Sequence, residues 1–319
     1  MEKIPLTDRK YVATFTIVTS LFMLWGIAIS MGDVLNRHFQ KVLHVSLAQS
    51  GLVQFSIFGA YAVMGIPAGL FMKRFGYKNG VLMGLLLYAF GAFLFIPAAG
   101  AESFGFFRIA LFILACGLAT LEAVAHPFAA ALGDERKSEQ RINFSQTFNA
   151  VGAIIGPLLG SFFILRAALT GDTQTDLYSV KILYAAIGTV VLSIAIGFFF
   201  LKVPHIQEAS PVAGKERTFV DLFRYRHFRW AMIAQFFNVA AQGGTWAFFI
   251  NYAVTYMPGM TDATAAQYFS FSMAMMLTGR IVGTFLMNYI APNRLLAIYT
   301  SGSILFCFLI WQKLGVVSL

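Results

Sequence analysis

The sequence predicts an all-α polytopic membrane protein, and two observations carry that prediction. Of the 319 residues, 58% are hydrophobic and only 12% are charged, whereas a soluble domain carries about 25% charged residues. The apolar residues also form runs long enough to cross a bilayer as helices, which takes about 20 residues. None of these runs alternates apolar and polar residues, as the strands of a membrane barrel do.

Nine helices follow from the apolar runs and the polar residues that separate them. They cover about residues 11–36, 47–73, 79–99, 104–132, 142–166, 177–202, 228–256, 262–290 and 294–314. The first run is longer than the core of a signal peptide and lacks a small-residue cleavage site, so we expect it to remain as the first membrane helix.

One long polar connection divides the chain. Residues 203–226 contain Pro204 and Pro211 together with several charges, as is typical of a loop between helical bundles. We therefore expect a six-helix bundle at 1–202, a cytoplasmic linker at 203–226 and a partial, three-helix second bundle at 227–319.

The positions of the basic residues predict the orientation in the membrane. If the N-terminus is cytoplasmic, the inner segments carry most of the 23 Lys and Arg residues. Those inner residues are Lys3, Arg9, Lys10, Lys73, Arg74, Lys78, Arg136, Lys137, Arg141, Lys202, Lys215, Arg217, Arg224, Arg226, Arg229 and Arg294. Lys and Arg concentrate in cytoplasmic loops. The net charge of +9 is therefore explained by topology, and we expect no nucleic-acid partner.

A short repeat relates the two predicted bundles. Gly65 and Gly69, near the end of the second helix, match Gly279 and Gly283, near the end of the eighth. Small residues four apart let helices approach closely, although glycine is common enough in membrane helices for such a match to arise by coincidence. Two parallel bundles around a linker are the layout of the major facilitator fold. By that repeat, a complete second bundle would have three helices beyond the ninth.

Two carboxylates lie inside predicted helices, where a charge is costly and therefore indicates a function. Asp33 shares one face of the first helix with Trp25, and is either a titratable carboxylate in a cleft or a solvated residue at the outer boundary. Glu122 lies well inside the fourth helix, with His126 one turn later on the same face. We predict that Glu122 binds a proton or a sugar, with a structural Glu–His pair as the alternative. His126 fits helix packing as well as it fits function.

Amide side chains and a tryptophan suggest the kind of solute. The fifth helix carries Gln146 and Asn149, and one face of the seventh carries Gln235, Asn238, Gln242 and Trp246. Amides hydrogen-bond hydroxyl groups and an indole covers the apolar face of a sugar ring. Hydrogen bonding between helices is the alternative for each residue alone, but the stripe as a whole favours the lining of a sugar-binding cavity.

Enzyme motifs are absent from the sequence. It has no phosphate-binding glycine loop, no nucleophile elbow and no metal-ligand spacing, and its two cysteines, Cys116 and Cys307, lie in apolar runs. We expect a protein without enzymatic activity, metal or cofactor. Transport would run on an ion gradient or by passive exchange, and protons suit isolated buried carboxylates as the coupling ion.

Six segments resemble the fucose–galactose–glucose proton symporter family of the major facilitator superfamily. They are LFMLWGIAISMGDVLN from Leu21, IPAGLFMKRFGYK from Ile66, LEAVAHPFAAALG from Leu121, NFSQTFNAVGAIIG from Asn143, RWAMIAQFFNVAAQGGTW from Arg229 and YMPGMT from Tyr256. The segment from Ile66 resembles the signature loop of the superfamily, with Lys73 where an Asp is usual. Fucose-type members carry asparagines where this chain has Ile29, Ser30 and Gly32, so the exact sugar stays open.

The resemblance implies a monomeric, proton-coupled symporter that imports L-fucose or a related monosaccharide by alternating access in a bacterial inner membrane. It implies that Asp33 and Glu122 couple protons, and that Trp25, Gln146, Asn149, Gln242 and Trp246 line the sugar site. The family has twelve helices, of which this chain is expected to hold nine. The alternatives are a glucose/galactose or other small-solute transporter of the superfamily, or a truncated remnant that does not transport.

Overall fold

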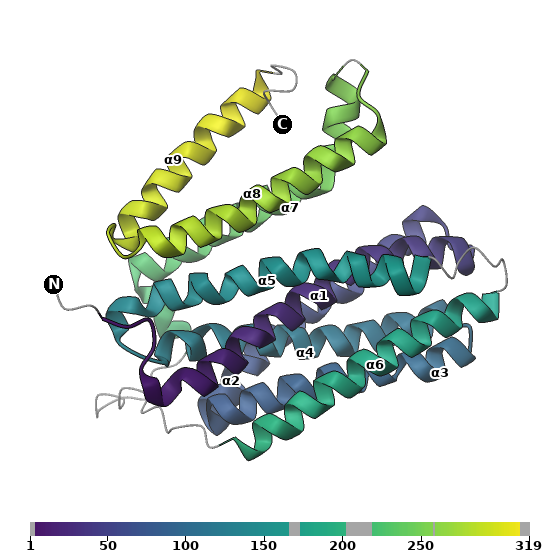
Figure 1. Cartoon of the computed structure of the whole chain (residues 1–319), viewed down its shortest axis with the longest axis horizontal. Coiled ribbons are helices and arrows are strands. Elements are labelled where there is room, and N and C mark those ends of the chain that lie inside the picture. The colour runs from purple at the N-terminus through teal and green to yellow at the C-terminus, as the bar shows by residue number, and fades with distance from the viewer. Residues whose placement is uncertain (1–3, 166–172, 202–218, 258, 313–319) are drawn as a thin grey trace. The chain divides into compact units, whose positions relative to one another are not determined.

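The computed structural model describes residues 4–165, 173–201, 219–257 and 259–312. Helices form every main element of this described part, and it contains no strand. They are α1 (Val12–Val42), α2 (Leu47–Phe93), α3 (Phe95–Gly100), α4 (Phe104–Ala131), α5 (Ser138–Gly160), α6 (Thr173–Phe200), α7 (Arg226–Tyr256), α8 (Asp262–Leu286) and α9 (Pro292–Trp311) (Figure 1). The predicted all-α class is therefore confirmed.

The second and third predicted helices form one nearly continuous element with a sharp bend. The expected loop at residues 74–78 is reduced to Gly76, whose backbone angles (φ 82°, ψ 169°) are not helical, so α2 turns at this residue. Glycine adopts a positive φ without steric cost because it has no Cβ. After the bend the helical path continues to Phe93, and α3 (Phe95–Gly100) follows it.

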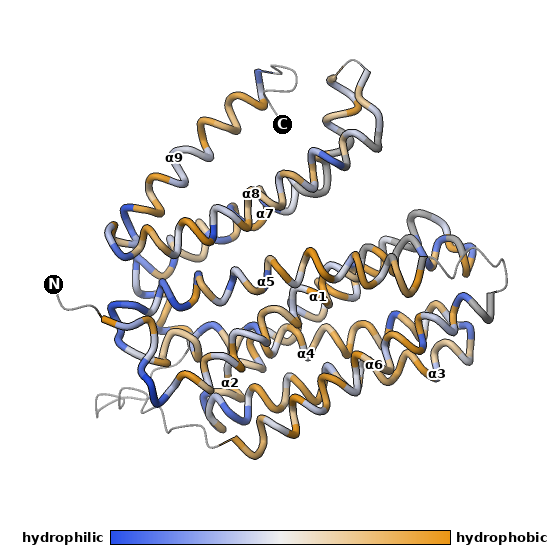
Figure 2. Tube along the Cα trace, viewed as in Figure 1, coloured by the Kyte–Doolittle hydropathy of each residue, from blue (hydrophilic) through white to orange (hydrophobic). Residues whose placement is uncertain are grey.

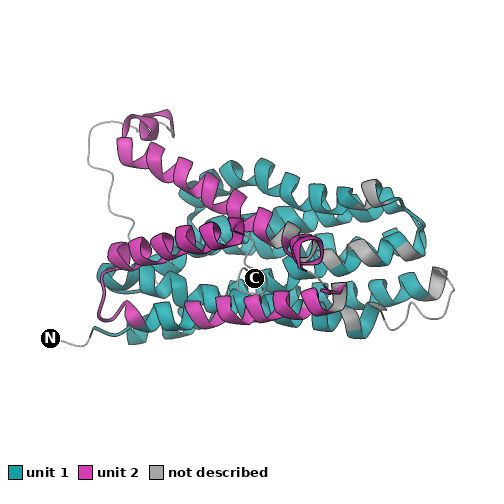
Figure 3. Cartoon of the chain, turned by 90° about the horizontal axis from the view of Figure 1, so that it is seen from above, with its two compact units in different colours: residues 1–205, 280–285 teal, residues 206–279, 286–319 magenta. Residues whose placement is uncertain are grey.

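Two compact units make up the chain, and Figure 3 colours them separately. Unit 1 comprises residues 1–205 and 280–285, and unit 2 comprises residues 206–279 and 286–319. Within unit 1, α2 packs against α4 and α6, while α1 packs against α4 and α5. The α1–α5 contact needs glycine, because a Cβ at Gly152 would overlap the carbonyl oxygen of Met23.

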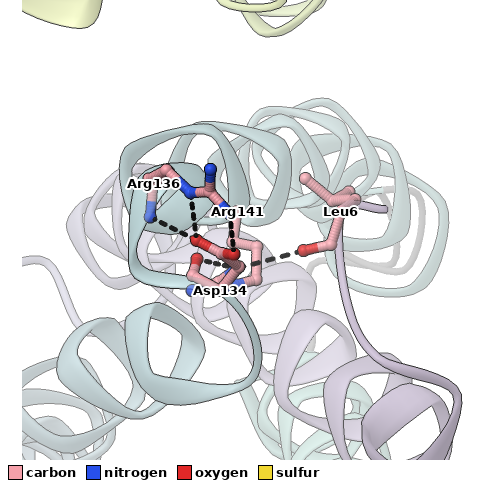
Figure 4. Close-up of polar contacts among 4 residues, drawn as sticks. All are labelled: Leu6, Asp134, Arg136 and Arg141. Carbon is pink, nitrogen blue, oxygen red and sulfur yellow. Dashed lines mark hydrogen bonds and ion pairs between the residues drawn. The ribbon is translucent and has the colours of Figure 1, made fainter. Parts of the chain in front are cut away.

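A buried arginine joins the end of α4 to the start of α5. Arg141 has 0% of its surface exposed, and its guanidinium donates to the carbonyl oxygens of Ala129 (3.0 Å), Ala130, Asp134 (2.9 Å) and Leu6 (3.1 Å). Figure 4 shows how Leu6, Asp134 and Arg141 converge. The last carbonyl groups of a helix lack partners within the helix. Arg141 therefore caps α4 and fastens the N-terminal segment to it.

An ion pair shapes the same connection on its exposed side. The Asp134 carboxylate accepts hydrogen bonds from the Arg136 guanidinium (2.7 Å) and from the Arg136 backbone N–H (2.9 Å). These hydrogen bonds from Arg136 lower the pKa of Asp134 to about 2, because they stabilise the charged carboxylate.

Lys78 makes a second long-range contact to a helix end. Its Nζ donates to the carbonyl oxygens of Phe199 (2.7 Å) and Leu201 (2.9 Å). Lys78 lies just after the bend of α2, so it links that bend to the C-terminal end of α6.

Unit 2 has a much smaller core. The Tyr252 hydroxyl of α7 donates to the Ile310 carbonyl of α9 (2.8 Å), and the Phe249 and Phe269 rings of α7 and α8 lie 5.4 Å apart. Most other side chains of these helices are exposed, for example Phe236 at 69%.

Seven segments of the described chain are long and apolar enough to cross a membrane. The sequence predicted nine, and the difference has two causes. The bent run Gly51–Gly100 counts once although it contains two predicted helices, and α7 is not among the seven. The α7 sequence carries Arg226, Arg229 and the amide stripe, which lower its hydropathy. Figure 2 shows hydrophobic residues along the helices and hydrophilic ones gathered mainly towards their ends.

Candidate functional site

The site begins with the two ionisable residues of α4. Glu122 and His126 lie one helical turn apart and are both partly buried. Their contact differs from the expected side-chain pair, because His126 Nδ1 lies 2.9 Å from the backbone carbonyl oxygen of Glu122 and not from its carboxyl group. The Glu122 carboxyl group is therefore left for other partners.

Tyr61 of α2 is the partner of that carboxyl group. Its hydroxyl forms a side-chain hydrogen bond with Glu122, and the same hydroxyl accepts the indole N–H of Trp25 in α1 at 2.5 Å. Three helices thus meet through three side chains. Sequence reasoning missed Tyr61, since a tyrosine within an apolar helix carries no charge or amide signal that would distinguish it from a packing residue.

His126 is oriented by groups from three helices. Its Nε2 lies 2.6 Å from the amide nitrogen of Gln146 in α5. An amide nitrogen can only donate, so this contact fits an imidazole whose Nε2 accepts and whose Nδ1–H donates to the Glu122 carbonyl. The Phe22 and Trp25 rings of α1 meet the imidazole edge-on, with centroids 4.9 and 6.4 Å away.

These residues form one hydrogen-bonded group, which we term the Glu122 cluster: Trp25, Tyr61, Glu122, His126 and Gln146. It combines a carboxyl group, a hydroxyl, an amide, an imidazole and an indole from α1, α2, α4 and α5. Such a set can exchange a proton at the carboxyl group and can donate to and accept from the hydroxyl groups of a ligand.

The charge of the cluster is nearly isolated. Within the described chain Glu122 forms no ion pair. The guanidinium of Arg280, which belongs to the same unit, lies close enough to His126 for their charges to interact. No group of three or more His, Cys, Asp or Glu side chains among the described residues could hold a metal ion.

The remaining predicted residues are not part of the cluster. Asn149 of α5 donates to the Phe22 carbonyl of α1 (3.2 Å) and so contributes to helix packing. Gln235, Asn238 and Gln242 lie on α7 in unit 2, and all three are exposed. The backbones of Asp33 and Trp246 lie in α1 and α7, but their side chains fall outside the described part of the structure.

Two shallow apolar hollows lie elsewhere. One, of about 520 Å³, is lined mainly by α2 residues between Phe71 and Phe90. The other, of about 640 Å³, is lined by α7 residues between Phe228 and Ala240. Neither contains a member of the Glu122 cluster.

Comparison with known proteins gives a consistent family assignment. The Major Facilitator Superfamily model matches residues 11–316. The L-fucose-proton symporter of Escherichia coli (strain K12) is 37% identical over 321 residues, covering 95% of this chain and 73% of that protein. A glucose/galactose transporter of Brucella abortus biovar 1 (strain 9-941) is 30% identical, covering 98% of this chain and 76% of that protein.

A solved structure supports the same assignment. The crystal structure of a Major Facilitator Superfamily transporter, FucP, in the outward conformation matches this chain with a TM-score of 0.87 and 36% identity, over 97% of this chain and 80% of that one. The all-α fold, the membrane-spanning helices and the sequence identity agree. The chain is an integral membrane protein that belongs to the Major Facilitator Superfamily, in the branch that contains L-fucose-proton symporters and glucose/galactose transporters.

Proposed function

We propose that the protein is a proton-coupled symporter that imports L-fucose or a related monosaccharide across a bacterial inner membrane by alternating access. The observation that carries the proposal is the Glu122 carboxyl group, which lies inside α4 and is hydrogen-bonded by Tyr61 without a cationic partner among the described residues. The similarity to L-fucose-proton symporters supports the choice of solute and coupling ion.

A carboxyl group in this setting can couple a proton to a sugar. An ionised carboxylate only accepts hydrogen bonds, whereas the protonated acid also donates one. A sugar hydroxyl that needs both a donor and an acceptor therefore binds better to the protonated form. Because such coupling is reciprocal, bound sugar also favours proton uptake. We assign the coupling role to Glu122 and, from its place in α1, to Asp33.

The neighbouring residues would recognise the sugar. The Trp25 indole N–H donates to the Tyr61 hydroxyl and is not available to a sugar. Trp25 would therefore contact the sugar through the face of its ring. His126 and Gln146 hold each other in place. We assign substrate binding to these residues, to Glu122 itself, and to Asn149, Gln235, Asn238, Gln242 and Trp246.

The wider organisation is part of the proposal. We propose bundles at 1–202 and 227–319 joined by a cytoplasmic linker at 203–226, with the N-terminus in the cytoplasm. We further propose that the protein acts as a monomer, needs no cofactor besides the coupling proton, and has no enzymatic activity. The names of the relatives, which are transporters, support a transport activity without enzymatic chemistry.

Proton movement on sugar addition tests the proposed function. In lightly buffered proteoliposomes, addition of L-fucose should make the outside medium alkaline, because the sugar enters with a proton. Glu122→Gln should abolish this signal, and uptake driven by a pH gradient should fall at least tenfold. Glu135→Gln makes the same chemical change at an exposed position and should leave both unchanged. A normal signal in Glu122→Gln would contradict the proposal.

Glucose or galactose is the second candidate substrate. The 30% identity to a glucose/galactose transporter favours it. Competition of labelled L-fucose uptake by unlabelled D-glucose, D-galactose and L-fucose separates the candidates. The sugar that competes at the lowest concentration identifies the substrate.

A further inference from the structure

The hydrogen bonds from Trp25 to Glu122 run in one direction. An indole N–H is a donor and never an acceptor, so the Tyr61 hydroxyl oxygen must accept the proton of Trp25 Nε1. The proton of the Tyr61 hydroxyl is then available for its other partner, the Glu122 carboxyl group. Tyr61 therefore acts as a donor to Glu122.

The Trp25 contact also restricts the Tyr61 hydroxyl. A phenolic hydroxyl can rotate about its C–O bond and choose among acceptors. With one lone pair occupied by Trp25, the hydroxyl proton is directed away from the indole. A donor that is already oriented stabilises a charge more effectively than one that must reorganise when the charge forms. Hydrogen bonds arranged in a chain also strengthen one another.

Among the described residues, no charged side chain makes the contact to the Glu122 carboxyl group that the neutral Tyr61 hydroxyl makes. Within the described residues, His126 of α4 binds the Glu122 backbone carbonyl, Gln146 of α5 binds His126, and Arg280 interacts with His126. The carboxyl group itself has a hydrogen bond from Tyr61 of α2 and no salt bridge. A single donor leaves the remaining acceptor positions of Glu122 free for a proton or a sugar hydroxyl.

We propose that Tyr61, oriented by Trp25, is the positioning residue that stabilises the ionised form of Glu122 and thereby sets the pH at which the protein releases its coupling proton. This inference rests on the coupling role proposed for Glu122. It makes a residue of α2 part of the control over Glu122. A change in the packing of α2 against α4 would therefore change the proton affinity of the Glu122 carboxyl group.

Tyr61→Phe is the central test, because it removes the hydroxyl and keeps the ring. The readout is the apparent affinity for sugar as a function of pH in proteoliposomes. Sugar binds the protonated form, and the ionised form loses its donor in the variant. The pH at which the affinity falls to half should therefore move upward by about one unit, as expected for one hydrogen bond to a charged group.

Two further variants keep the test decisive. Trp25→Phe leaves Tyr61 in place and removes its orienting donor, so the pH midpoint should move in the same direction by a smaller amount. Tyr88→Phe removes a buried hydroxyl from the same helix, α2, and should leave the midpoint unchanged. A midpoint that stays fixed in both Tyr61→Phe and Trp25→Phe, or that moves downward, would overturn the inference.

A double variant separates this inference from the proposed function. In the Glu122→Gln background, Tyr61→Phe should leave the pH dependence of the sugar affinity unchanged, because Tyr61 acts through the carboxyl group. If Glu122→Gln alone keeps sugar-induced proton uptake, the proposed function fails. If Glu122→Gln loses it while Tyr61→Phe alone keeps the wild-type pH midpoint, only the role of Tyr61 fails.

Discussion

The two units use their polar side chains in opposite ways. In unit 1, Glu122, His126 and Gln146 are hydrogen-bonded to groups from neighbouring helices. In unit 2, the α7 amides are exposed, and none of the three described ones makes a side-chain hydrogen bond within the described structure. A side chain that is already paired is held in position before a ligand arrives, whereas an unpaired amide keeps its full capacity to bind one. The described polar side chains of the Glu122 cluster are thus held in fixed positions, whereas the three described α7 amides keep their hydrogen-bonding capacity.

The largest effect is expected where unit 1 is most tightly bonded. Arg141→Met should lower the free energy of unfolding by about 3 kcal/mol, because several carbonyl oxygens at the end of α4 lose a charged donor. Arg229→Met changes an exposed arginine of α7 and should alter stability by less than about 0.5 kcal/mol. Thermal unfolding in detergent measures both. Equal effects would show that the two units do not differ as described.

Glycine substitutions sharpen the same contrast in packing. Gly152→Ala should destabilise the protein by about 1–3 kcal/mol, because the added Cβ meets the Met23 carbonyl across the α1–α5 contact. Gly302→Ala in α9 places its Cβ in open space and should be neutral or stabilising by up to about 1 kcal/mol. Unfolding midpoints in detergent compare the pair. A neutral Gly152→Ala would contradict the close approach of α1 and α5.

Two amide variants separate fixed from uncommitted polar groups. Gln146→Ala should cost about 1 kcal/mol of stability, because His126 loses a hydrogen bond, and should also weaken sugar uptake about tenfold. Gln242→Ala should weaken uptake by a similar factor while changing stability by less than about 0.5 kcal/mol. Uptake assays and unfolding midpoints measured on the same preparations distinguish amides that stabilise the fold from amides that only bind sugar. A destabilised Gln242→Ala would mean that the α7 amides are structural.

The smallest effect is the pH dependence at the α4–α5 connection. The folded-state pKa of Asp134 lies at about 2, below its ordinary value. Its stabilising contribution is therefore complete above the unfolded value of about 4 and disappears as the pH falls through about 2. Asp134→Asn should unfold at a slightly lower temperature than wild type at pH 7 and at the same temperature below pH 2. Glu135→Gln serves as the control, and a gap that persists in acid would contradict the ion pair.

The helices and the family could be predicted because their signals lie along the sequence. The fourth helix was expected at 104–132 and spans Phe104–Ala131, since apolar runs bounded by polar residues mark helix ends directly. The sequence predicts a turn at residues 74–78, and the bend at Gly76 lies within it. Its sharpness could not be predicted, because the polar residues around it would suit a longer loop equally well.

The site was only partly predictable, because its contacts come from tertiary packing. Helical spacing placed Glu122 and His126 on one face, but it could not indicate that the imidazole binds the backbone carbonyl. Tyr61 enters the cluster only because α2 approaches α4. Arg141 was counted among the basic residues that predict orientation, whereas the structure buries it against carbonyl oxygens. Charge counting treats every arginine alike, and burial distinguishes them.

The contact of Lys78 with the end of α6 has a consequence for biogenesis. Its two acceptors lie more than a hundred residues downstream, and Leu201 is 123 residues away. At about 5–20 residues per second, the ribosome needs roughly ten seconds to synthesise that stretch. During this interval the Lys78 ammonium group lacks these two acceptors. Once α6 has been inserted, the same ammonium group can donate to both carbonyl oxygens and so join α2 to the end of α6. Charge-reversal experiments at this lysine would therefore report on insertion and on late assembly together.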